Sequence, residues 1–290
     1  MALCDDVRAS CARIAVDAGW VAIAEDALEQ VVPGPPLALD PLTHYLEGSE
    51  ADVATYMLTV DAVNFGSGWF PTLAKRSGCS GYTTIVWAIA DRFRADGPWS
   101  AAQLRALRAD ELADTLGQRR DHELMALYAQ ALRALGSFLG DRDALALVRE
   151  ARGSAERLAT TLASGMAMFA DRGFYKRAQI AAADLALAGV ASFGDLHRLT
   201  IFADNVVPHV LRCDGVLRYD DALAAHIDAG MALRSGEQER EIRACAVHAC
   251  ELIAGRLKVA PRVLDTWLWN RGQASRYKAV PRHRTRTVFY

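Results

Sequence analysis

The chain has 290 residues, a formal net charge of −2 and a sequence pI of about 6.4. Its hydrophobic fraction of 52% and charged fraction of 23% are those of a globular protein and exclude a disordered chain. Without an overall positive field, the chain is a poor candidate for sequence-independent binding of nucleic acid, so any anion site must be a local cluster. Alanine fills 53 of the 290 positions, which favours helices and disfavours an all-β fold.

The pattern of apolar residues, prolines and capping residues predicts one helix after another. The first prediction, one or two helices over 4–31, ends at Pro-Gly-Pro-Pro, residues 33–36. Asp40 then caps a segment that starts with Pro41. Residues 83–87 fit either a short strand or the start of a helix. The other predicted helices lie near 50–63, 100–107, 110–117, 121–139, 142–151, 154–170, 176–190, 195–212, 220–234, 237–257 and 261–269.

Alternating strand–helix units are missing, which disfavours Rossmann and TIM-barrel architectures. The motifs GxGxxG, GxxxxGK[ST], GxSxG and HExxH do not occur. The sequence therefore predicts an all-α fold, a compact multi-helix bundle with room for one short β-hairpin. Because no internal repeat or low-complexity linker divides the chain, we expect residues 1–290 to form a single domain. Two lobes with the active site in the cleft between them are one form this domain could take.

The N-terminal sequence MALCDDVRASCARIAV carries acidic residues and lacks a long apolar stretch, so it does not read as a signal peptide. No uncharged apolar run approaches the roughly 18 residues that a membrane-spanning helix needs. We expect a cytoplasmic protein without membrane contact.

The six cysteines include no Cys-x-x-Cys pair. Cys245, His248 and Cys250 fit on one helix and could suggest zinc, but known zinc sites use tighter pairs and a second half. Buried, reduced thiols are the favoured interpretation. We expect no metal and no cofactor.

Three segments combine glycine, aromatic and acidic residues, and each has a structural and a functional interpretation. The first, DAVNFGSGWFP at 61–71, follows a helix and carries amide, hydroxyl and aromatic groups. Its glycines would let the backbone approach a ligand closely, although a helix C-cap with hydrophobic anchoring has the same pattern. The second, FGDLHRLTIFADNVVP at 193–208, holds Asp204 in an apolar stretch. Such an acid is paired, caps a helix or lies in a cleft, and the residues alone favour an N-cap.

The third segment, DTWLWN at 265–270, places Asp265 and Trp269 on one helical face, where Asp265 needs a partner. Its tryptophans are more often core than ligand platform. A basic run at 282–286 could form a phosphate pocket. The apolar residues 288–290 after it predict that this tail docks onto the protein.

Together these segments resemble the queuosine salvage family, the queuosine 5′-phosphate N-glycosylase/hydrolases. The motifs that carry the resemblance are VNFGSGWFP (63–71), FYKRAQIAAADL (174–185), LTIFADNVVPHVL (199–211), DTWLWN (265–270) and PRHRTRTVFY (281–290). Each motif is weak alone, but five in order over nearly the whole chain are specific. The resemblance implies a fold similar to helix-hairpin-helix DNA glycosylases, and release of the base queuine from queuosine 5′-monophosphate for reuse in tRNA.

The same resemblance implies the roles of individual residues. Cleavage of an N-glycosidic bond builds positive charge on the ribose carbon, and Asp204 is the candidate carboxylate that stabilises it or attacks it. Phe202 suits stacking on the base, and the helix at 265–270 supplies acceptors to the amine groups of the base. The implied substrate-binding residues are His44, Asn64, Phe65, Lys176, Phe202, Asp265, Thr266 and Asn270. The phosphate candidates are Lys176, Arg177, Arg198 and residues 282–286. Asp184 is a second candidate acid, although its alanine neighbours suggest a packed helix.

Two other functions remain as alternatives. A DNA glycosylase-like base excision enzyme could share the fold, but duplex binding needs a cationic face that the net charge of −2 does not favour. A non-catalytic queuine-binding protein would bind the base without releasing it from a nucleotide. We expect a small-molecule substrate, queuosine 5′-monophosphate, with queuine as product and no nucleic acid as partner. The oligomeric state, the preference for nucleoside or nucleotide, and the choice between a covalent and a direct-water mechanism stay open.

Overall fold

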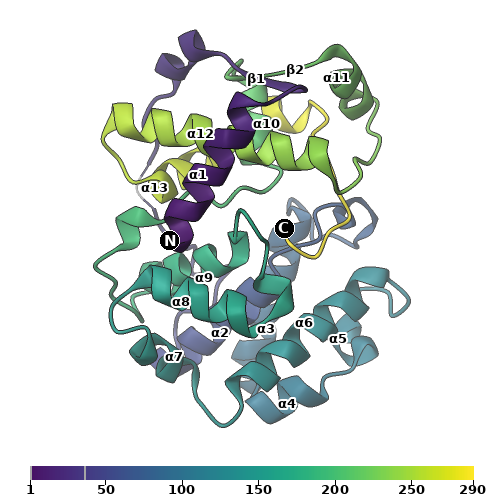
Figure 1. Ribbon diagram of the computed structural model, residues 1–290. Coiled ribbons are helices and arrows are strands. Elements are labelled where there is room, and N and C mark those ends of the chain that lie inside the picture. Colours follow the sequence, from purple (N-terminus) through teal and green to yellow (C-terminus); the bar gives the residue numbers. More distant parts are fainter. Residues whose placement is uncertain (1, 36) are drawn as a thin grey trace.

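The computed structural model describes residues 2–35 and 37–290, and its regular structure is almost entirely helical (Figure 1). The prediction of a mainly helical fold is therefore confirmed. Met1 and Pro36, which belong to the predicted N-terminal segment and to the predicted break at 33–36, lie outside the described residues. None of the helices within the described ranges is long and apolar enough to cross a membrane.

The longer helices follow one another along the whole chain. The α-helices are α1 (Leu3–Val16), α2 (Glu50–Ala62), α3 (Gly81–Asp96), α4 (Ala101–Ala106), α5 (Ala109–Thr115), α6 (Glu123–Leu139), α7 (Ala144–Glu150), α8 (Ala155–Gly165), α9 (Lys176–Leu187), α10 (Val207–Cys213), α11 (Asp221–Asp228), α12 (Glu237–Leu257), α13 (Pro261–Arg271) and α14 (Ser275–Lys278). The short 3-10 helices are η1 (Glu25–Gln30), η2 (Phe70–Thr72), η3 (Ala167–Phe169) and η4 (Leu196–Arg198).

The two strands, β1 (Val21–Ile23) and β2 (Leu217–Tyr219), form one antiparallel pair in which Val21 lies opposite Tyr219. They are far apart in the sequence, with most of the helices between them, so the pair is not the short hairpin that the sequence allowed for. The second half of the predicted helix over 4–31 is also wrong, because α1 stops at Val16 and is followed by β1 and η1. Residues 83–87 lie inside α3, which confirms the helical alternative for that segment.

Two predicted helix starts differ from the structure. Asp40 and Pro41 open a turn rather than a helix, with the Asp40 carboxylate accepting from the Leu42 N–H at 3.0 Å. Helix α5 begins at Ala109, one residue before the predicted start.

The predicted helix over 195–212 is the correction that matters most for function. Only η4 and α10 are helical there, and the chain between them is irregular. Pro208 lies in the first turn of α10, where a missing N–H is tolerated, and the helix begins there. The predicted helix over 220–234 also ends early, at Asp228, before Gly230 adopts a φ of 71°.

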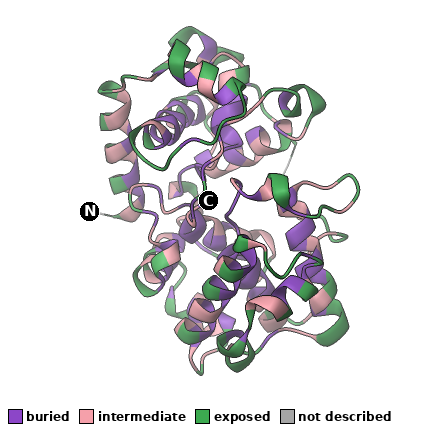
Figure 2. Cartoon of the chain, turned by 90° about the vertical axis from the view of Figure 1, so that its right-hand side faces the viewer, coloured by how far each residue is buried: buried purple, intermediate pink, exposed green. Residues whose placement is uncertain are grey.

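The buried hydrophobic side chains form two separate cores. One is built from α2 to α9, and the other joins α1 to α10, α12, α13 and the two strands. Helix α1 packs on α12 in the second core, and α2 packs on α9 in the first. Figure 2 shows the buried positions on the inward faces of the helices in both halves. Along the chain, α1 lies in the second core, α2 to α9 form the first, and the segments from α10 onward complete the second.

The irregular connection between η4 and α10 links the two cores. Its side chains are buried, and Ile201 and Ala203 belong to the second core whereas Phe202 belongs to the first. Side chains of an extended chain alternate in this way, so Phe202 and Asp204 point to the same side. The residues after α14 run back between the halves (yellow in Figure 1), and the carbonyl of Arg284 accepts from the Leu233 N–H at 2.9 Å.

Candidate active site

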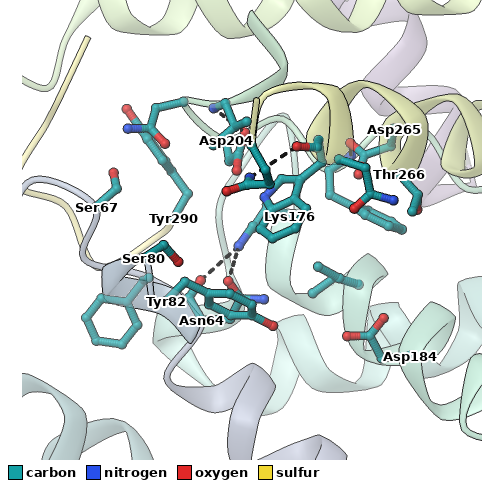
Figure 3. Close-up of a pocket in the computed structure, with 18 of the residues that line it drawn as sticks. Asn64, Ser67, Ser80, Tyr82, Lys176, Asp184, Asp204, Asp265, Thr266 and Tyr290 are labelled. Carbon is teal, nitrogen blue, oxygen red and sulfur yellow. Dashed lines mark hydrogen bonds between the residues drawn. The ribbon is translucent and has the colours of Figure 1, made fainter. Parts of the chain in front are cut away.

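A cavity of about 220 Å³ lies where the two cores meet (Figure 3). The predicted catalytic residue and all of the predicted substrate-binding residues line it: Asp204, His44, Asn64, Phe65, Lys176, Phe202, Asp265, Thr266 and Asn270. They come from five separate parts of the chain, so the fold gathers them at one place.

The first core supplies one wall of the cavity through α9. Lys176, Ile180, Asp184 and Leu187 line the cavity at spacings of three and four residues, which places them on one helical face. Asp184, the second candidate acid, therefore lines the cavity, although its helix is also packed on α2 and α8, as its alanine neighbours suggested. The sequence spacing already indicates that Asp184 lies on the same side of α9 as Lys176, because residues eight apart share a helical face.

The turn after α2 supplies Asn64 and Phe65 to the cavity, and its glycines are required by close packing. Gly66 has a φ of 96°, and a Cβ there would lie 2.6 Å from the side chain of Leu124. A Cβ on Gly68 would lie 2.5 Å from the backbone oxygen of Thr285 in the tail. The Gly66 N–H also donates to the carbonyl of Tyr290 at 3.0 Å, so the turn and the tail are fixed to each other.

Lys176 is the central cation of the cavity. Its Nζ donates to the backbone oxygen of Asn64 at 2.9 Å and to Asn64 Oδ1 at 2.7 Å, as the dashed lines in Figure 3 show. Burial lowers the pKa of Lys176 to about 8, although the negative charge of Asp204 acts in the opposite direction. The ammonium therefore stays mostly charged at neutral pH and keeps one N–H for another partner.

Asp204 lies in the irregular connection just before α10. Its Oδ1 accepts from the backbone N–H of Val206 at 2.7 Å and of Val207 at 3.1 Å. Asp204 therefore caps the start of α10 from two positions before the N-cap residue, which is Val206, and not as the N-cap that the residues alone favoured. The same side chain also lines the cavity. Among the residues that the structure describes, none donates to Oδ2. The cap fixes the direction of the carboxylate and leaves one oxygen available.

Asp265 on α13 lies close to Asp204 but in a different environment. It is only 6% exposed, and its Oδ1 accepts from the Phe202 N–H at 2.8 Å. Burial raises the pKa of Asp265 to about 8, and the charge of Asp204 adds to this effect. A pKa of about 8 favours the protonated form at neutral pH, and in that form the free oxygen is a donor. The acceptor role that the sequence suggested stays a prediction.

The other nominated residues lie around these three. His44 Nδ1 is 3.1 Å from the Asp40 carbonyl, and burial lowers the pKa of its ring, so a neutral ring with Nε2 as acceptor fits. Thr266 and Asn270 follow Asp265 along α13, with Asn270 at the exposed rim. Phe65 packs edge-on against Tyr128, with centroids 5.0 Å apart, so its role is partly structural.

The basic residues predicted to bind the phosphate differ in whether they line the cavity. Arg177 is fully buried beneath Phe65 and donates to backbone carbonyls, including that of Val288 at 2.6 Å. Arg198 pairs with Asp5 and Glu156 outside the cavity, and Arg286 pairs with Glu123. Arg282 joins Lys176 in the cavity lining, and no described residue accepts a hydrogen bond from its side chain. Burial lowers the pKa of Arg282, although the charge of Asp204 acts against this effect.

The cavity is also lined by residues that were not predicted individually from the sequence. Tyr82 at the start of α3 packs edge-on against Trp269, and Ser67, Ser80 and Tyr290 also line the cavity. Single serines and tyrosines carry no spacing signal, so only the fold could reveal them. The tail docks as its apolar end predicted, with Tyr290 buried.

Cys245 and Cys250 are buried on α12. Within residues 2–35 and 37–290, no three His, Cys, Asp or Glu side chains cluster in a way that could hold a metal ion.

Comparison with known proteins adds an independent observation. A model of the family described as queuosine salvage protein matches residues 43–290, most of the chain. The chain belongs to the queuosine salvage protein family. A queuosine 5′-phosphate N-glycosylase/hydrolase of Sphaerobacter thermophilus is 32% identical over 275 residues, which cover 85% of this chain and 84% of that protein. The protein of the same name from Nematostella vectensis is 28% identical over 296 residues, 85% of each chain.

A shorter match has higher identity. The queuosine 5′-phosphate N-glycosylase/hydrolase of Dictyostelium discoideum is 39% identical over 127 residues, 40% of each chain. All three relatives carry the name of an N-glycosylase/hydrolase of queuosine 5′-phosphate.

Proposed function

We propose that this chain hydrolyses the N-glycosidic bond of queuosine 5′-monophosphate and releases free queuine. The observation that carries the proposal is the position of Asp204, a carboxylate with one free oxygen in a cavity that also holds a cation and a buried acid. Membership of the queuosine salvage protein family supports the choice of nucleotide.

Asp204 acts on the ribose in this proposal. The bond to the base weakens before water attacks, so positive charge develops on the ribose carbon. A carboxylate held beside that carbon stabilises the charge, and the effect is strong when the carboxylate is preorganised. The two backbone N–H groups on Oδ1 hold the carboxylate in place, so Oδ2 can face the sugar, orient water or attack.

Asp265 acts on the departing base. A 7-deazapurine lacks the ring nitrogen that other purine hydrolases protonate, so its departure needs hydrogen bonds along the remaining polar edge. Protonated Asp265 can donate one such bond, and Thr266 and Asn270 lie beside it on α13. Phe202, whose N–H holds Asp265, is suited to stack on the base.

Arg282 and Lys176 are the proposed partners of the 5′-phosphate. Both line the cavity, whereas Arg177, Arg198 and Arg286 do not line it and are paired with other groups. A guanidinium presents two parallel donors to a phosphate, and Lys176 adds a point charge. His44, with a neutral ring, is proposed to accept a hydrogen bond from the base or its diol.

The rest of the proposal concerns the setting of the reaction. We assign the enzyme to the cytoplasm, as one domain with two lobes and the active site between them. It acts on a free nucleotide rather than on nucleic acid, and it uses no cofactor or metal.

The test is incubation of the purified chain with queuosine 5′-monophosphate and, separately, with the nucleoside, followed by chromatographic measurement of free queuine. Time-dependent release of queuine is the expected result. Tight queuine binding without any release would favour a binding protein. Excision of a base from damaged duplex DNA, without release from the nucleotide, would favour a DNA glycosylase. Either result would contradict the proposal.

A further inference from the structure

Two carboxyl groups face each other where α2 packs on α9. Asp61, on the last turn of α2, is fully buried, and neither of its carboxylate oxygens accepts a hydrogen bond from a described residue. The neighbour of Asp61 is the carboxyl group of Asp184 on α9. Asp184 is only partly buried because it lines the cavity. The pair therefore has one hidden member and one that a ligand can reach.

The surroundings of the two acids disfavour a negative charge on both at once. Burial raises the pKa of each carboxyl group above its usual range, and the charge of the neighbouring acid raises that of Asp61 further. Two buried carboxylates side by side do not both ionise, so one proton between them satisfies both groups. Lys176 lies close enough to lower the pKa of both, which favours a pair that keeps one negative charge.

The pair makes one end of the cavity acidic. In Figure 3, Asp184 lies on one side of Lys176, and Ser67 and Ser80 lie on the other. Hydroxyl groups and Arg282 suit an anion, whereas a partly ionised carboxyl pair suits a cation. Queuine carries on its deazapurine ring an aminomethyl arm whose secondary amine is cationic at neutral pH. A nucleotide with a phosphate at one end and this amine at the other matches both ends of the cavity.

We propose that Asp184, held in place by Asp61, binds the cationic amine of the substrate's base and selects for bases that carry this arm. Asp184 is a specificity-determining residue, because it touches the arm and not the bond that breaks. Asp61 is a positioning residue, because it acts on the ligand only through Asp184. This inference rests on the proposed function, since it assumes that the cavity holds a 7-deazaguanine base.

The test uses two free bases of similar size. One is 7-aminomethyl-7-deazaguanine, which carries a cationic amine, and the other is 7-cyano-7-deazaguanine, which carries a neutral nitrile at the same place. Dissociation constants are measured by calorimetry for the wild-type chain and for Asp184→Asn. Asparagine keeps the shape and can donate to Asp61 in place of the shared proton, so the variant is expected to fold, as thermal melting will show.

The wild-type chain is expected to bind the aminomethyl base about 10- to 100-fold more tightly than the cyano base, the range of a hydrogen bond to a charged group. Asp184→Asn is expected to lose this preference. Asp220→Asn, which removes one carboxylate from the capping position of α11 outside the cavity, should keep it.

Two results would overturn the inference: a wild-type chain without preference, or the same preference in Asp184→Asn. If the asparagine variant does not fold, Asp184→Ser serves in the same comparison. Hydrolysis of queuosine 5′-monophosphate is measured on the same preparations. Hydrolysis without preference for the amine would contradict the assignment of Asp184 alone, whereas preference without hydrolysis would contradict the proposed function alone.

Discussion

Two groups of buried charges lie close together in this protein, and they are built in opposite ways. In the first, Arg243 on α12 pairs with Asp171 at 2.5 Å and with Glu239 at 3.3 Å, and donates to the Ala203 carbonyl at 2.9 Å. Its guanidinium also lies between the rings of Phe174 and Tyr290. Every charge of this cluster, which we call the Arg243 cluster, has a partner.

The second group, Asp265 in the cavity and Asp61 behind it, lacks such ion pairs. Asp61 accepts no hydrogen bond from a described residue, and Asp265 accepts one, from a backbone N–H. Burial raises the pKa of both. Buried charges that are fully paired stabilise a particular packing, whereas acids kept in an unfavourable state mark places where a ligand completes the contacts. By this criterion the Arg243 cluster has a structural role, whereas Asp61 and Asp265 are candidates for a role in ligand binding.

The largest effect on stability is expected from breaking the Arg243 cluster. Arg243→Met removes the cation and leaves Asp171 and Glu239 buried without a partner. The free energy of unfolding should fall by about 3–5 kcal/mol, measured by urea denaturation. A loss below about 1 kcal/mol would show that the cluster is not the structural element we describe.

A smaller loss is expected from Gly68→Ala, which disturbs the contact between the turn after α2 and the tail. The added Cβ would lie 2.5 Å from the Thr285 backbone oxygen, so the tail that carries Arg282 and Tyr290 must shift. The free energy of unfolding should fall by about 1–3 kcal/mol, and hydrolysis should weaken as well. Gly236→Ala, where no atom lies within 4 Å of the new Cβ, is the control and should leave hydrolysis unchanged.

The pH dependence of hydrolysis tests the cavity acids directly. Asp265 and Lys176 both have a pKa of about 8, and both are needed in their protonated forms. Activity should therefore fall as pH rises through 8, by about tenfold per pH unit for each group that must keep its proton. Asp265→Asn keeps a donor and cannot lose a proton, so its profile should fall less steeply. A wild-type profile that is flat from pH 7 to 10 would contradict both assignments.

The smallest effect has the opposite sign. Because its pKa is raised in the folded state, Asp61 lowers stability increasingly as pH rises above the usual carboxyl range. Asp61→Asn should therefore raise the free energy of unfolding by about 1 kcal/mol at pH 8, and by less at pH 5. Denaturation at the two pH values measures this difference. A destabilised variant at pH 8 would place Asp61 with the paired charges.

The sequence predicted the helical fold well, because alanine content, caps and proline positions act locally. It failed where contacts between distant segments decide the structure. The pairing of β1 with β2 joins segments that are far apart in the sequence, and the irregular segment around Phe202 is fixed by two cores that the sequence does not reveal. The predicted catalytic and substrate-binding positions all line the cavity, because the motifs of the resemblance mark those positions, but the phosphate candidates Arg177, Arg198 and Arg286 do not.

The states of those residues could not be predicted in the same way. The sequence predicts Asp265 as an acceptor. Its pKa of about 8, which favours the protonated form at neutral pH, follows from its burial beside Asp204 and could not be predicted from the sequence. Asp61 and Asp184 lie 123 positions apart (184 − 61), and only the packing of α2 on α9 brings them together.

The most direct measurement compares two aspartates that each hold the first turn of a helix through backbone N–H groups. Asp204 and Asp220 each accept a backbone N–H at 2.7 Å at the start of a helix, but only Asp204 lines the cavity. Asparagine can replace either cap, so both variants should fold. Asp204→Asn should lower the rate of queuine release from queuosine 5′-monophosphate by at least about 100-fold, while Asp220→Asn should hydrolyse at the wild-type rate. Turnover by Asp204→Asn within threefold of wild type would contradict the assignment of Asp204 as the catalytic carboxylate.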